Sequence, residues 1–278
     1  MRFPDTFAGS TLLAMGDDLL PFTAHRIEIR PGVWTAAEGR ERDPFQSLRL
    51  RVLTDAAGGT LKGERVLDVG CLEGGYSVAL AELGSREVIG IDARPQHIAR
   101  CELLKRELRL DNVHFYREDV KNISRERFGC FDVVFAAGIL YHLDDPFQFV
   151  ATLSEITREF ALIDTHITWD DLATHGCSPE LQTRRFRGRT FAGRTFSEYP
   201  DGSDAEFVKD LPWSAYSNAT SFWLTERSLV ELLWTMGFEH VSRTYTPFGA
   251  FCDEGCEREC RVEIIARKTP HRRRRWPL

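Results

Sequence analysis

The sequence lacks the features of membrane and secreted proteins. It contains no run of eighteen apolar residues, whereas a helix needs about 20 to cross a bilayer, so we expect no membrane-spanning segment. Residues 1–5 lack the basic, apolar and small-residue pattern of a signal peptide, and none is expected. The seven cysteines, an odd number, fall mostly in predicted core elements. This cysteine usage favours a reducing cytoplasm over a disulfide-stabilised secreted fold.

The sequence also lacks an excess of positive charge. It carries 36 basic and 42 acidic residues, a formal net charge of −6, which argues against a broad nucleic-acid surface. Positive charge gathers only in an arginine-rich stretch, residues 184–194, and in four arginines at 272–275. We interpret this tail as a solvated end; contact with RNA, an acidic lipid or a partner is the alternative.

Short β-branched runs alternate with helical patterns between residues 65 and 164. The predicted strands are 66–69, 87–91, 113–116, 131–136 and 160–163, and helices separate most of them. Strands joined by helices pair in parallel through right-handed crossovers. The sequence therefore predicts an α/β protein with a doubly wound, mostly parallel sheet.

The flanking segments complete this core. Asp43 and Pro44 predict the start of a helix, and residues 166–222 lose periodicity, which is typical of a lid or substrate loop. A helix follows from Thr225 to Gly237, and strands at 241–246 and 262–266 form a carboxyl-terminal hairpin. We divide the chain into an amino-terminal lid or helical segment (1–60), a cofactor-binding core (61–165), a substrate loop (166–224), a completing helix and strands (225–268) and a basic tail (269–278).

A glycine-rich turn follows the first core strand, where Gly70, Gly74 and Gly75 let a ligand approach the backbone. Their spacing is not G-x-G-x-x-G, and no G-x-x-x-x-G-K-[ST] occurs, so the sequence lacks both the dinucleotide fingerprint and a P-loop. Acids lie at or just after three successive strands: Asp68, Asp92, placed for a ribose diol, and Asp119, placed for an adenine amino group. This arrangement predicts an adenosine site.

Residues 66–75 resemble motif I of the class I S-adenosylmethionine-dependent methyltransferases, although Leu72 and Glu73 stand where many members have a third glycine. Residues 88–92 are similar to their second motif and 131–135 to their fourth. The resemblance implies a Rossmann-like, seven-stranded fold with S-adenosylmethionine as cofactor and the glycine turn facing its methionine part. The cofactor-binding residues expected are Asp68, Gly70, Cys71, Gly74, Gly75, Asp92, Ala93, Arg94, Asp119, Val120, Ala137 and Gly138.

Residues 138–146, 25–35 and 218–238 are similar to the group that contains the tRNA wobble-uridine (5-oxyacetic acid) alkyltransferases and many uncharacterised bacterial methyltransferases. The tRNA enzymes of this group carry a longer, more basic amino-terminal part, which this sequence lacks. The leading hypothesis is therefore O-methylation of a hydroxyl on a small metabolite, sugar or oligosaccharide. There are two alternatives: a tRNA wobble-uridine methyl or carboxymethyl transferase, and a non-catalytic module that binds the cofactor. The sequence leaves open whether the protein forms a homodimer.

Histidines supply the candidate bases. His142 follows the fourth core strand, where the acceptor is expected, and its alternative role is to orient that loop or pack on the cofactor. His166, after the fifth strand, is the second candidate. The residues expected to wall the substrate pocket are Trp34, Tyr141, Asn218 and Trp223. His25 is expected to cap or pack the amino-terminal segment.

Metal dependence is the less favoured interpretation of two acidic pairs, Asp144–Asp145 and 170–171, because adjacent acids point in different directions. Cys252, Cys256 and Cys260 have C-x3-C-x3-C spacing in the last turn. Free thiols are our interpretation, with a structural zinc site as the alternative. We therefore assign no metal ligands.

Overall fold

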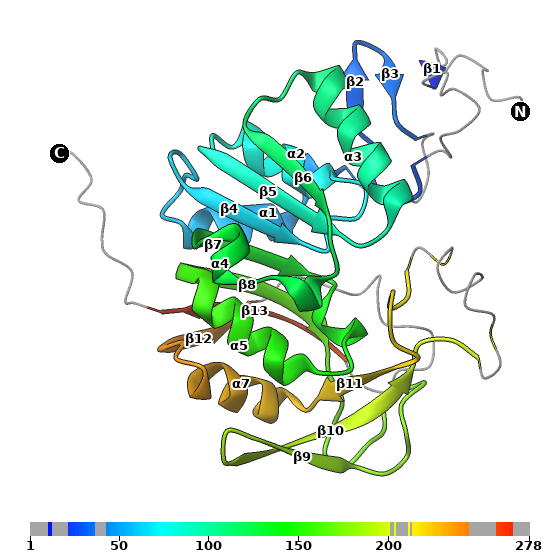
Figure 1. Cartoon of the computed structure of the whole chain (residues 1–278), viewed down its shortest axis with the longest axis vertical. Helices are drawn as coiled ribbons and strands as arrows, with labels where there is room; N and C mark the ends of the chain where they lie inside the picture. The colour runs from blue at the N-terminus through cyan, green and yellow to red at the C-terminus, as the bar shows by residue number, and fades with distance from the viewer. Residues whose placement is uncertain are drawn as a thin grey trace, which may run out of the picture.

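A seven-stranded sheet forms the centre of the computed structural model (Figure 1), which describes residues 11–12, 22–36, 43–200, 203, 211, 213–244 and 260–268. The strand order is β12-β13-β8-β7-β4-β5-β6; β13 is antiparallel to both of its neighbours, β12 and β8, and the other neighbouring pairs are parallel. The strands are β4 (Arg65–Val69), β5 (Glu87–Asp92), β6 (Val113–Arg117), β7 (Phe131–Ala137), β8 (Thr157–His166), β12 (His240–Arg243) and β13 (Arg261–Arg267). The predicted doubly wound fold with an antiparallel carboxyl-terminal hairpin is confirmed.

Helices cover both faces of this sheet. On one face, a cluster of buried apolar side chains joins Val66 and Val133 of the strands to the first helices. On the other face, a second cluster joins Leu67 and Val134 to the later helices. Successive strand residues point to opposite faces, so a strand covered on both must be apolar throughout, as β7 nearly is. The helices are α1 (Leu48–Ala56), α2 (Gly75–Glu82), α3 (Pro95–Leu108), α4 (Arg125–Phe128), α5 (Pro146–Ile156) and α7 (Glu226–Thr235).

The stretch 166–222 is more regular than its sequence indicates. β9 (Gln182–Phe186) and β10 (Arg189–Ser197) form a hairpin, and β11 (Thr220–Leu224) extends it to a three-stranded antiparallel sheet. Arg187 and Gly188 have φ values of 46° and 78°, which suit a tight hairpin turn. One face of this three-stranded sheet packs on α5 through Phe191 and Phe222. Arginines at the exposed positions obscure the alternation of apolar and polar residues that marks a strand in the sequence.

The amino-terminal region differs from its prediction in one respect. The helix expected from Asp43 is split into a 3₁₀ turn, Pro44–Gln46, and α1, because Ser47 has an extended backbone. Phe45 and Leu48, which a continuous helix would place on its inner face, are 47% and 49% exposed. Before this turn, β2 (Glu28–Arg30) and β3 (Val33–Trp34) pair with each other, and β1 (Thr11–Leu12) pairs with β3. Within the described ranges, no helix is long and apolar enough to cross a membrane.

Candidate active site

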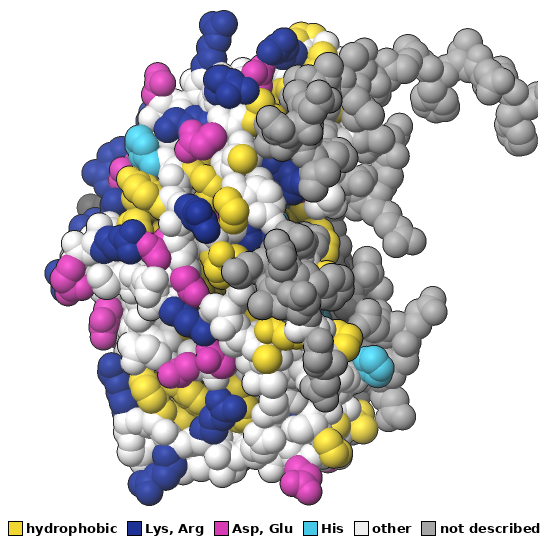
Figure 2. Space-filling model, turned by 45° about the vertical axis from the view of Figure 1, so that its right-hand side comes forward, with side chains coloured by type: hydrophobic (Ala, Val, Ile, Leu, Met, Phe, Trp, Pro, Cys, Tyr) yellow, Lys and Arg dark blue, Asp and Glu magenta, His cyan; other side chains and the backbone are white. Residues whose placement is uncertain are grey.

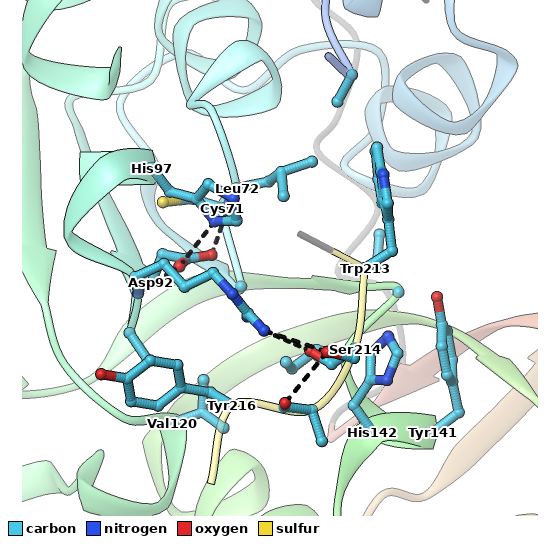
Figure 3. Close-up of a pocket in the computed structure, with 18 of the residues that line it drawn as sticks. Cys71, Leu72, Asp92, His97, Val120, Tyr141, His142, Trp213, Ser214 and Tyr216 are labelled. Atoms are coloured by element: carbon cyan, nitrogen blue, oxygen red, sulfur yellow. Dashed lines mark hydrogen bonds and ion pairs between the residues drawn. The ribbon is translucent and has the colours of Figure 1, made fainter. Parts of the chain in front are cut away.

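A cavity of about 540 Å³ lies at the carboxyl ends of the parallel strands (Figure 3), where open α/β sheets bind ligands. Its walls come from the loops after β4, β5, β6 and β7, from residues 23–25, and from residues 213–218, which we call the cover segment. Ligand pockets of about 300–1,000 Å³ hold small molecules, so this cavity has the size for a nucleoside with a further substituent. Topology therefore brings distant segments together around one site.

The glycine turn has two different parts. Gly70 lines the cavity, has φ +72° and donates its N–H to Ile91 O at 2.8 Å, so the turn bends sharply beneath the cavity. Gly74 and Gly75 are absent from the lining. A Cβ on Gly74 would lie 2.9 Å from Cys101 Sγ, and one on Gly75 would lie 2.6 Å from the His25 ring. These two glycines permit close packing of α2 against its neighbours.

Glu73 explains why this turn departs from the usual glycine pattern. Its fully buried carboxylate accepts hydrogen bonds from the Thr23 N–H at 2.8 Å, the Ala24 N–H at 3.0 Å and Arg100 Nη1 at 2.9 Å. Several donors and a buried cation satisfy a charge that burial alone would disfavour. Glu73 thereby holds the amino-terminal segment against the cavity, where His25 becomes part of its wall.

Two predicted acids sit at the ends of β4 and β5. Asp92 accepts hydrogen bonds from the backbone N–H groups of Leu72 at 3.1 Å and Arg94 at 2.9 Å, and its Oδ1 lies 3.0 Å from His97 Nδ1. Asp68 accepts a hydrogen bond from Ser77 Oγ at 2.6 Å, but burial raises the pKa of this carboxyl to about 7. Both carboxyl groups line the cavity in fixed orientations.

Asp119, the third predicted acid, meets the cover segment. It caps the 3₁₀ turn Val120–Asn122 and accepts a hydrogen bond from Ser217 Oγ at 2.9 Å. Arg94, in the loop after β5, donates from Nη2 to Ser214 O at 2.9 Å, one of the contacts of Ser214 drawn as dashed lines in Figure 3. The cover segment is thus attached to the loops that follow β5 and β6.

His142 lines the cavity beside Tyr141, on the 3₁₀ turn Leu140–His142 after β7. Its Nδ1 lies 2.9 Å from Oε2 of Glu198, whose side chain is 1% exposed. Burial raises the pKa of Glu198, yet its interactions with His142, Ser221 and the Ala215 N–H together outweigh this effect, and the pKa lies below its ordinary value. An ionised Glu198 requires a proton on Nδ1, which leaves Nε2 of the neutral ring as the basic nitrogen.

The remaining predicted residues do not all reach the cavity. Asn218 lines it and donates to His142 O at 3.0 Å, whereas His166, Trp223 and Trp34 are absent from its lining. His166 stacks on Trp223 with ring centroids 4.9 Å apart, and burial lowers its pKa to about 4. Trp223 donates Nε1 to Tyr141 O at 2.8 Å and so supports the loop from behind. Trp34 lies beneath Arg26, 3.6 Å from the guanidinium carbon to the ring centroid.

A buried group of four charges borders the cavity. Arg49 Nη2 donates to Asp164 Oδ2 at 2.6 Å and its Nε to Glu263 Oε2 at 3.1 Å, while Arg261 Nε donates to Asp164 Oδ1 at 2.8 Å. All four residues are at most 7% exposed, and the two arginines line the cavity. Opposite charges balance within the group, which burial requires. Sequence reasoning missed these residues and Glu198, because no local pattern links segments so far apart.

No cluster of three or more His, Cys, Asp or Glu side chains suited to a metal occurs among the described residues. Asp144 pairs with Lys121 Nζ at 2.8 Å, and Asp145 accepts hydrogen bonds from the first turn of α5. Cys260 is buried, with its Sγ 3.7 Å from His166 Nδ1. Cys252, Cys256 and the arginine tail lie outside the described residues.

Known proteins similar to this chain include methyltransferases. Residues 60–170 match a family model described as a methyltransferase domain. A tRNA U34 carboxymethyltransferase of Alteromonas mediterranea is 32% identical over 36% of this chain and 31% of its own. A ubiquinone biosynthesis O-methyltransferase of Acinetobacter baumannii is 30% identical over 44% of this chain and 51% of its own. These alignments span about a third to a half of the relatives' lengths.

The same fold occurs in the crystal structure of the N-terminal domain of EvdMO1 in the presence of SAH and D-fucose. Its TM-score is 0.66 at 22% identity, and the alignment covers 88% of this chain and 90% of that one. Residues 60–170 therefore match a methyltransferase domain, and the chain has the class I fold of the S-adenosylmethionine-dependent methyltransferases. S-adenosylmethionine is the cofactor of this class, and the cavity fits it by size, by the close approach at Gly70 and by the acids at three successive strands.

Proposed function

We propose that this protein methylates a hydroxyl group of a small metabolite, sugar or oligosaccharide, with His142 as the base. One observation supports this assignment above the others: His142 lines the cofactor cavity while the buried Glu198 carboxylate lies 2.9 Å from its Nδ1. A hydroxyl acceptor must lose a proton, and a histidine with Nε2 available is suited to take it near neutral pH. His166 is the weaker candidate, because a pKa of about 4 makes it a poor base.

When bound, the cofactor would supply an electrophilic methyl group, whose carbon–sulfur bond breaks as the acceptor oxygen attacks the methyl carbon in line, leaving a neutral thioether. In this proposal Asp92 holds the ribose diol, Asp119 the adenine amino group, and Gly70 the methionine part beside the β4 turn. Tyr141 and Asn218 line the acceptor side with His142, and the cover segment limits the access of water. His142 Nε2 takes the acceptor proton as the new carbon–oxygen bond forms.

The acceptor class is inferred from the mouth of the cavity. Trp213 is 59% exposed although it lines the cavity, so a broad apolar ring face is available to a ligand. Aromatic rings pack well against flat apolar faces, including those of ring-shaped acceptors. The similar domain solved with D-fucose makes sugars the first acceptors to test, and the relative named for ubiquinone biosynthesis makes phenols the second.

The test measures methyl transfer from radiolabelled S-adenosylmethionine into a panel of D-fucose, its glycosides and catechol-type phenols. We expect His142→Ala to bind S-adenosylhomocysteine as tightly as the wild type and to lose about 10²–10⁴-fold in kcat, the range of general base catalysis. His166→Ala is the matched control and should keep more activity. Wild-type turnover by His142→Ala would remove this histidine from the mechanism. Cofactor binding without transfer to any acceptor would favour a regulatory module.

A tRNA acceptor is the second candidate, because of the similarity to the tRNA U34 carboxymethyltransferase. The β9–β10 hairpin exposes Arg185, Arg187 and Arg189. On the face shown in Figure 2, however, acidic and basic side chains are interspersed. Binding of unmodified tRNA with a steep dependence on salt, lost on replacing the three arginines, would support this candidate.

A further inference from the structure

Glu198 lies where the base and the cover segment meet. It follows the last residue of β10, and its carboxylate is almost completely buried. A single oxygen, Oε2, lies 2.9 Å from His142 Nδ1 and also accepts the backbone N–H of Ala215 at 2.9 Å. One carboxylate oxygen therefore joins the proposed base to the middle of the cover segment.

The cover segment has further attachments on both sides of the cavity. Ser214 O and Ser217 Oγ contact Arg94 and Asp119 on the cofactor side. Asn218 Nδ2 donates to the backbone oxygen of His142 on the acceptor side. A ligand that enters beneath this segment contacts the same loops to which the segment is attached.

The shared oxygen makes the two contacts interdependent. A buried carboxylate stays ionised only while hydrogen-bond donors compensate for its loss of water. Departure of the segment would remove the Ala215 donor and expose Glu198 to water, which would compete with His142 for the same oxygen. The imidazole would then share that oxygen with water, which weakens the contact that fixes its tautomer and its orientation.

We propose that Glu198 is a positioning residue that couples closure of the cover segment over the cofactor to the orientation of the His142 base. The inference rests on the proposed role of His142. Closure holds the Nδ1 proton toward Glu198 and keeps Nε2 free to accept a proton. His142 therefore has the tautomer and orientation of a base only when the cover segment closes the cavity. Closure also limits the contact of this imidazole with water before the acceptor is in place.

The first test reads the tautomer directly by ¹⁵N NMR of the histidine rings, with the protein saturated with S-adenosylhomocysteine. We expect wild-type His142, assigned with His142→Gln, to show a protonated Nδ1 and an unprotonated Nε2. In Glu198→Gln the amide can donate as well as accept, so the signals should move toward the Nε2–H tautomer. Glu180→Gln, an exposed change, is the matched control. An unchanged pattern in Glu198→Gln overturns the proposal.

The second test concerns the coupling itself. Ala215→Pro removes the N–H donor but leaves Glu198 and His142 in place, so it stays informative if Glu198→Gln fails to fold. We expect hydrogen exchange of a peptide spanning 213–221 to slow at least tenfold with S-adenosylhomocysteine in the wild type and much less in either variant. Wild-type protection in both variants, or an unaltered His142 pattern in Ala215→Pro, overturns the coupling. Neither test uses turnover, so their failure is distinguishable from failure of the proposed reaction.

Discussion

Replacement of Asp68 by asparagine should stabilise the protein at alkaline pH and leave it unchanged in acid. Burial raises the pKa of this carboxyl from 3.8 to about 7. Between these values the folded protein keeps a proton that the unfolded chain has released, so the contribution of Asp68 to stability falls as the pH rises from about 4 to about 7. About three pKa units at about 1.36 kcal/mol each give a loss of roughly 4 kcal/mol.

The Asp68→Asn side chain stays neutral at every pH and can still accept the hydrogen bond from Ser77. Urea unfolding without cofactor should show no difference between variant and wild type at pH 4.5, and a midpoint roughly 1–2 M higher for the variant at pH 8.5. Asp55→Asn, on the exposed side of α1, is the control. A difference that stays constant from pH 4.5 to 8.5 would refute the reasoning. Asp68 lines the cavity, so this loss of folding stability arises at the cofactor site. Residues needed for function commonly reduce the stability of the fold.

Three further outcomes follow from the site. Trp213→Ala should raise the acceptor KM about tenfold at similar kcat, which is the scale of one aromatic contact. Trp234 on α7 is similarly exposed, and Trp234→Ala should leave the KM unchanged. Equal effects of the two substitutions would contradict a role for Trp213. Asp92→Asn should weaken S-adenosylhomocysteine binding by about 10–100-fold in calorimetry, as loss of a charged acceptor implies. Arg49→Met should cost about 3–5 kcal/mol in urea unfolding, because it leaves buried Asp164 partly uncompensated; wild-type stability would show that other donors suffice.

Local patterns in the sequence predicted the core fold, because each pattern reflects the backbone or burial preferences of residues that are close together in the chain. Apolar runs such as β7 must be strands covered on both faces, and Pro95 and Gly84 mark helix ends through fixed or left-handed backbone angles. The β9–β10 hairpin was missed, since its arginines obscure the alternation and the Arg187–Gly188 turn has no strong signal. The helix expected from Asp43 was only partly right, because the extended Ser47 interrupts it.

The sequence by itself determined the sheet, the cofactor class and the edge of the sheet where Asp68, Asp92 and Asp119 gather, because strand ends of a parallel sheet share one edge. Tertiary structure alone decided which of the two candidate bases, His142 or His166, meets a buried carboxylate. Glu198 lies 56 residues beyond His142 and reaches it only through the packing of the inserted sheet. The proposed base is thus a product of long-range packing, which no spacing in the sequence encodes.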